Sequence, residues 1–85
     1  MKKLFAISYD LRNAKDYQSL YDEFDRIGAK PILESTWGVK LPEGNTAIMV
    51  RDHFKRFVDN DDAIMVSEVC DWATINVINT PNRLK

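Results

Sequence analysis

Near its start the chain reads Leu4-Phe5-Ala6-Ile7-Ser8-Tyr9-Asp10, a short apolar run of strand-forming residues with no helical continuation. Side chains of a strand point alternately to its two faces. One face takes Leu4 and Ala6, and the other takes Phe5, Ile7 and Tyr9. A sheet that is covered on one face only should alternate apolar and polar residues. The run therefore predicts a first strand over residues 4–9 in a sheet that is covered on both faces.

A helix is expected after this strand. Its apolar positions recur at helical spacing on one stripe, namely Tyr17, Leu20, Tyr21, Phe24 and Ile27, and the polar residues Asp16, Asp22, Glu23, Asp25 and Arg26 fall outside it. Asn13 or Asp16 can cap the start of this helix. Gly28 suits the position just after its end, where a left-handed backbone costs a glycine little.

A second helix is expected after the turn at residues 42–45, with Thr46 as its cap. Its inward stripe is Ala47, Val50, Phe54, Phe57 and Val58, and residues 59–62 end it. Ile48 and Met49 lie off that stripe, so a brief strand there is the competing interpretation.

The other apolar runs predict strands. Residues 31–41 form a strand pair or one long kinked strand, with Ser35 and Gly38 as the bends, and residues 63–69 and 72–78 form two more strands. The order β-α-β-β-α-β plus a C-terminal strand indicates an α+β, ferredoxin-like split βαβ sandwich with two helices on one face of a mainly antiparallel sheet. Residues 1–80 are expected to be a single domain and residues 81–85 a flexible tail.

The bulk composition favours a small cytoplasmic protein that pairs with itself. The chain has 85 residues, which allows one core, and two helices can cover only one sheet face, so a homodimer is expected. One cysteine fits a reducing compartment, and the apolar start is too short for an export signal or a membrane span. The formal charge of −1 argues against tight nonspecific nucleic-acid binding.

Four short motifs, taken together, resemble the Cas2-like family. They are residues Ile7-Ser8-Tyr9-Asp10-Leu11, Glu34-Ser35-Thr36-Trp37, Val50-Arg51-Asp52-His53-Phe54 and Asp71-Trp72-Ala73. This group includes the CRISPR-associated adaptation subunit, VapD-type toxins of toxin-antitoxin systems and SinR-like proteins, and the motifs are most similar to the SinR-like branch. The resemblance implies a ferredoxin-like subunit in a dimer with sheets face to face, whose terminal strand often adds to the partner's sheet.

Asp10 is the leading candidate for chemistry. In nuclease members of the family an aspartate at this place, one from each subunit, is proposed to hold a divalent metal near the dimer axis. Mg²⁺ or Mn²⁺ held by carboxylate oxygens can activate water for phosphodiester attack. The alternative is a strand-end carboxylate that accepts backbone N–H bonds from the turn at residues 11–13.

Basic and aromatic residues offer further candidate sites. A stripe that binds phosphate or nucleic acid is predicted from Arg12, Lys15, Arg51 and Lys55, and a dimer interface from Phe5, Ile7, Tyr9, Trp37 and Trp72. Nearby aspartates dilute the basic stripe, so an ordinary solvated helix face is its alternative. Exposed tryptophans would instead allow base stacking. His53, the single histidine, has no evident catalytic partners.

Three functions remain open from the sequence. The first is a homodimeric adaptor of a mobile-element or defence system that binds protein or nucleic acid, the second is a metal-dependent nuclease that uses Asp10, and the third is a dimer that binds a small nucleotide. The charge balance and the lone carboxylate favour the adaptor.

Overall fold

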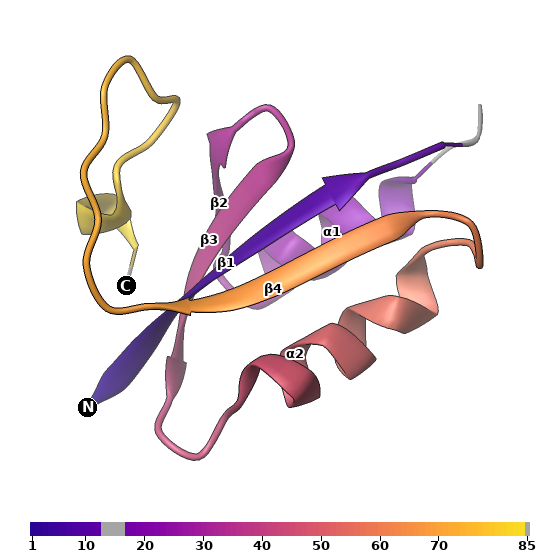
Figure 1. Cartoon of the computed structure of the whole chain (residues 1–85), viewed down its shortest axis with the longest axis horizontal. Helices are drawn as coiled ribbons and strands as arrows, with labels where there is room; N and C mark the ends of the chain where they lie inside the picture. The colour runs from indigo at the N-terminus through magenta and orange to yellow at the C-terminus, as the bar shows by residue number, and fades with distance from the viewer. Residues whose placement is uncertain (13–16, 85) are drawn as a thin grey trace.

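The computed structural model describes residues 1–12 and 17–84. Its elements are β1 (Lys2–Asp10), α1 (Gln18–Arg26), β2 (Lys30–Leu33), β3 (Thr36–Pro42), α2 (Ala47–Phe54), η1 (Lys55–Phe57), β4 (Ala63–Val69) and η2 (Pro81–Arg83). Both α-helices lie on the same face of one sheet (Figure 1). No helix among the described residues is long and apolar enough to cross a membrane.

The sheet has the strand order β2-β3-β1-β4, and all neighbouring strands are antiparallel. β1 lies in the centre, where Phe5 is opposite Val39 of β3 and Glu68 of β4. This topology confirms the expected ferredoxin-like split βαβ arrangement. The predicted strand at residues 63–69 agrees with β4 at both ends.

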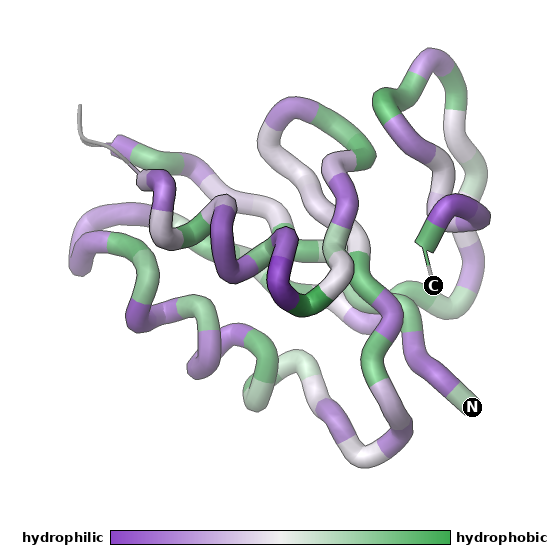
Figure 2. The backbone as a smooth tube through the Cα atoms, turned by 180° about the vertical axis from the view of Figure 1, so that it is seen from behind, coloured by the Kyte–Doolittle hydropathy of each residue, from purple (hydrophilic) through white to green (hydrophobic). Residues whose placement is uncertain are grey.

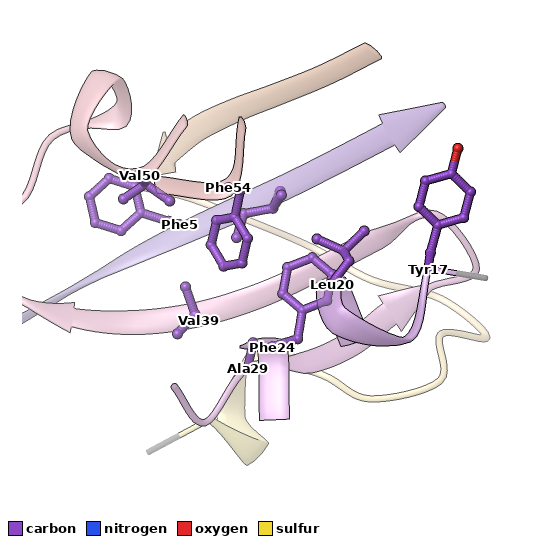
Figure 3. Packing of buried hydrophobic residues seen from close by; sticks show 9 residues of the cluster. Phe5, Tyr17, Leu20, Phe24, Ala29, Val39, Val50 and Phe54 are labelled. Carbon is purple, nitrogen blue, oxygen red and sulfur yellow. The ribbon is translucent and has the colours of Figure 1, made fainter. Parts of the chain in front are cut away.

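The core is one apolar layer between the sheet and the two helices (Figure 3). Its buried members are Phe5, Ile7, Tyr17, Leu20, Phe24, Ala29, Val39, Val50 and Phe54. Both predicted helical stripes face this layer. Phe24 is fully buried, and its ring lies 4.6 Å from that of Trp37 and 4.9 Å from that of Phe54, measured between ring centroids.

The ends of the helices follow local rules. Gly28 has a φ of +80°, as expected just after a helix, and the N–H of Ala29 donates to the carbonyl of Phe24 at 2.9 Å. Thr46 caps α2, because its Oγ1 accepts the N–H of Met49 at 3.2 Å. The competing strand at residues 48–49 is wrong. The caps proposed at residues 13 and 16 lie outside the described residues.

Residues 31–41 form a strand pair, with the turn at residues 34–35. Gly38 is not a bend but a position inside β3. A Cβ atom there would lie 2.6 Å from Ile32 Cδ1 and 3.1 Å from Leu84 Cδ1. Gly38 therefore allows the C-terminal residues to approach the sheet closely.

The prediction of a strand at residues 72–78 is wrong, because this segment is irregular. Its backbone is held by β2 instead. The N–H of Ile78 donates to the carbonyl of Ile32 at 2.8 Å, and Asn79 Nδ2 donates to that of Pro31 at 2.9 Å. The expected flexible tail is also corrected, since residues 81–83 form a 3₁₀ turn and Leu84 is buried.

Candidate functional site

α1 and α2 leave the other face of the sheet uncovered, and only the C-terminal segment lies over part of it in the described part of the chain. The strand register places on this open face Leu4, Ala6, Ser8, Thr36, Gly38, Lys40, Met65, Ser67 and Val69. The face is apolar at several positions, and Met65 is 65% exposed. Ser8 and Thr36 join their hydroxyls across two strands at 3.0 Å.

The predicted interface residues Phe5 and Ile7 do not lie on the open face. Their side chains are 0% and 1% exposed and pack beneath the helices. The prediction failed because alternation identifies two faces of β1 but does not say which of them the helices cover. An interface built on this sheet would use Leu4, Ala6 and Ser8.

Tyr9 and Trp37 also belong to the helix-covered face. The ring of Trp37 stacks on Phe24, and its Nε1 donates to the hydroxyl of Tyr9 at 3.2 Å. The Tyr9 hydroxyl in turn donates to the carbonyl of Glu34 at 3.1 Å. Burial raises the pKa of Tyr9 to about 12, with a further contribution from Tyr21. These two aromatic residues are therefore part of the monomer core and not of a second sheet face.

Trp72 is the one predicted interface residue that lies away from the helices. It is 39% exposed and lines an apolar cavity of about 330 Å³ between the C-terminal segment and one end of the open face. Leu4, Ala6 and Val69 contribute the sheet side of this cavity. Figure 2 shows hydrophobic stretches along the C-terminal loop. In this segment Ile75 and Ile78 are 82% and 58% exposed.

Asp10 ends β1 at the opposite end of the strand from Leu4. Its side chain is 74% exposed, and Arg12 Nη2 lies 3.7 Å from its Oδ2. The N–H of Arg12 donates to Asp62 Oδ1 at 2.8 Å, so a different carboxylate accepts this turn N–H. Among residues 1–12 and 17–84 no three His, Cys, Asp or Glu side chains gather as metal ligands. One chain thus offers a metal a single carboxylate here, which fits a shared site only if a second copy adds its own.

Asp62 is a structural residue that the sequence reasoning missed. Besides the N–H of Arg12 it accepts the Tyr17 hydroxyl, at 3.0 Å and 2.9 Å to its two oxygens, and the N–H of Asp59 at 2.8 Å. It therefore ties the segment after β1 and the start of α1 to the turn before β4. Its place in the run of residues 59–62 indicated a turn but not these distant partners.

The described residues of the predicted basic stripe surround this same turn. Arg51 and Lys55 line a pocket of about 410 Å³ together with Asp59 and Asp62. Arg12 Nη1 donates to the carbonyl of Asp61 at 3.1 Å. Lys15 lies outside the described residues. Acidic groups share the pocket and Arg51 pairs with Asp52 at 2.8 Å, so the local charge is mixed.

A buried carboxylate links the two helices, which the sequence reasoning had not predicted. Glu23 is 8% exposed and accepts Arg26 Nε at 2.7 Å and Arg26 Nη2 at 2.5 Å. His53 Nε2 of α2 lies 2.5 Å from Glu23 Oε2, and Arg56 Nη2 lies 3.0 Å from His53 Nδ1. The guanidinium of Arg26 holds the pKa of Glu23 down at about 2, against the opposing effect of burial. The i, i+3 spacing of Glu23 and Arg26 was the available signal.

Comparison with known proteins supports the fold. No protein-family model matches the chain. The chain is similar in structure to a hypothetical protein, TT1823, from Thermus thermophilus, with a TM-score of 0.67 over 88% of this chain and 90% of that chain. The two sequences are 21% identical, so the similarity extends to the fold alone.

Proposed function

We propose that the chain is a Cas2-like homodimeric binding module that pairs through the open face of its sheet and binds a protein or nucleic-acid partner through its outer surfaces. The observation that carries this proposal is the free end of the open face, where Met65 is 65% exposed and neither α-helix lies above it. A small domain gains most by covering such a surface with an identical one, because a two-fold axis makes the same patch complementary to itself.

The C-terminal segment supports the same proposal. It covers the end of the open face that contains Leu4. Ser8 and Met65, at the other end, do not line the cavity beneath the C-terminal segment. Ile75 and Ile78 remain exposed on it. The family resemblance implies that a terminal segment adds to the partner's sheet, and these two side chains would then be buried in the dimer.

Met65→Lys is expected to shift the protein from dimer to monomer, because it places a charge on the exposed end of the open face, which the dimer would bury. Met49→Lys is the matched control. Met49 is 52% exposed but lies on α2, away from the open face, so that variant should remain a dimer. Sedimentation-velocity ultracentrifugation over a range of protein concentrations distinguishes the two species. A wild-type protein that is monomeric throughout, or a Met65→Lys variant that dimerises as well as the Met49→Lys variant, would refute pairing through this face.

A metal-dependent nuclease that uses Asp10 is the second candidate. The observation in its favour is the exposure of Asp10 next to Met65 and Ser8, which line the same shallow pocket at the free end of the open face. Two copies that pair there would bring their two Asp10 side chains toward one axis, and paired carboxylates are suitable ligands for Mg²⁺ or Mn²⁺.

Asp10→Asn is the test of this second candidate. If the protein is a nuclease, cleavage of single- and double-stranded RNA and DNA in the presence of Mg²⁺ or Mn²⁺ should fall by at least about 100-fold, since the amide is a far weaker ligand than the carboxylate. The dimer fraction should not change. Asp25→Asn, at an exposed position of α1, is the matched control. Equal cleavage by both variants would leave the non-catalytic module as the function of this chain.

A further inference from the structure

A second cavity lies on the helical side of the molecule, far from the open face. It holds about 310 Å³ between the end of α1 and the first turns of α2, which is near the lower limit for sites that bind small molecules. Arg26 and Ile27 form one wall, Met49 and His53 form the other, and Leu41 of β3 lies beneath them. None of these residues takes part in the proposed dimer.

Arg26 supplies an oriented cationic group in this cleft. Two of its three guanidinium nitrogens, Nε and Nη2, bond to the carboxylate of Glu23. No acceptor in the described part of the chain bonds its third nitrogen, Nη1, and the Arg26 side chain is 66% exposed, so a ligand can reach it. Because Glu23 already holds the guanidinium of Arg26 in place, this side chain has lost much of its rotamer freedom. A second anion that binds Nη1 therefore costs little additional side-chain entropy.

Among the described residues that line the cleft, Arg26 is the one cationic arginine or lysine, and none is a carboxylate. Glu23 carries one negative charge. The guanidinium of Arg26 bonds it directly, and that of Arg56 bonds His53, which in turn bonds Glu23. The tautomer of His53 follows from its partners: Nε2 faces a carboxylate and carries the proton, and Nδ1 accepts from Arg56.

Apart from Asn45 and His53, the remainder of the lining is apolar. Leu41, Met49 and Phe54 are carbon-rich side chains at the cleft, and Met adapts readily to the shape of what it contacts. A ligand that fits this surface needs an apolar body and one negative head. A single lining guanidinium matches a monoanion better than a phosphate, which carries up to two charges at neutral pH.

We propose that the cleft between α1 and α2 binds a small monocarboxylate with an apolar chain. The carboxylate head pairs with the Arg26 guanidinium, and the chain packs on Leu41 and Met49. This site is independent of the dimer and of Asp10, and it is formed by a single chain.

Hexanoate and hexanamide are the matched probes, since they share size and chain and differ in charge. Titration of ¹⁵N-labelled protein at constant ionic strength should give saturable shifts of the amides of Ile27 and of residues 45–50, with millimolar affinity for hexanoate and at least about fivefold weaker binding of hexanamide. Equal affinities, or shifts that do not saturate at these amides, would overturn the proposal.

Met49→Glu and Met49→Gln separate charge from shape at the rim of the cleft. Met49 is 52% exposed in the first turn of α2, where either residue is compatible with the helix. A carboxylate on the wall of the cleft opposite Arg26 adds a negative charge to the site of the anion, so it should weaken hexanoate binding by roughly fivefold relative to the glutamine variant. Arg26→Gln, whose own spectrum reports whether it is folded, should remove the preference for hexanoate over hexanamide. The same hexanoate affinity in both Met49 variants would refute the proposed position of the head group.

Discussion

Phe24→Ala is expected to lower the free energy of unfolding by about 3–5 kcal/mol, the largest loss that we expect from one substitution. The ring of Phe24 is fully buried and lies between three elements. It stacks on Trp37 of β3 and lies beside Phe54 of α2 and Tyr9 of β1. The distances between ring centroids are 4.6 Å, 4.9 Å and 6.2 Å. Its removal leaves a cavity at the point where both helices meet the sheet. The free energy of unfolding of a small domain is low, so this loss is a large part of it.

Urea denaturation followed by circular dichroism measures this loss. In a Trp72→Phe background, which removes the second tryptophan, the fluorescence of Trp37 provides a local probe of the same cluster. Ile48→Ala is the control, because Ile48 is 63% exposed on α2 and its truncation should cost less than about 0.5 kcal/mol. Both variants must be compared at one protein concentration, since dimerisation adds to the apparent stability. Similar losses in the two variants would show that the aromatic cluster is not the centre of the core.

The elements of the fold could be predicted because each has a local signal. The stripe that contains Leu20 and Phe24 repeats at helical spacing, Gly28 marks the end of α1, and Thr46 marks the start of α2. A glycine just after a helix and a threonine just before one act through hydrogen bonds that are close in sequence, so no knowledge of distant contacts is needed.

The assignment of faces could not be predicted in the same way. β1 has apolar residues on both sides, and only the packing of α1 and α2 determines that Phe5 and Ile7 become core while Leu4 and Ala6 remain on the open face. The prediction of a strand at residues 72–78 failed for a related reason. A strand needs a partner to pair its backbone, and within one chain this segment bonds to β2 at single points instead of forming a ladder.

The candidate sites depend on contacts that are distant in sequence. Asp62 meets Arg12 across 50 positions, and Glu23 meets His53 across 30. Glu23 was expected on the polar side of its helix, yet it lies next to the buried Phe24 and is itself buried. Residue type and spacing indicated an Arg26 partner but gave no sign of His53, which approaches from the other helix.

Acidification should destabilise the protein through Glu23. The folded state holds the pKa of this carboxyl at about 2, below its ordinary value of 4.5, because Arg26 bonds the ionised form. Between these two values the unfolded chain binds more protons than the folded one, so the free energy of unfolding falls as the pH falls. The contribution is fully present above about pH 4.5 and is lost as the pH approaches 2. Solvent screens the exposed guanidinium, so we expect this contribution to be about 2 kcal/mol.

Glu23→Gln isolates this effect from that of the other carboxylates, because the amide cannot titrate. Unfolding free energies of both proteins, measured in urea at several values between pH 6 and pH 2.5, should converge as the pH falls, by about 2 kcal/mol in total. At pH 6 the variant should be the less stable protein, since Arg26 and His53 then face a neutral group. Asp25→Asn, at an exposed position of the same helix, should instead follow the wild-type curve at every pH. If the Glu23→Gln curve is also parallel to the wild-type curve, the bridge between α1 and α2 contributes no pH-dependent stability.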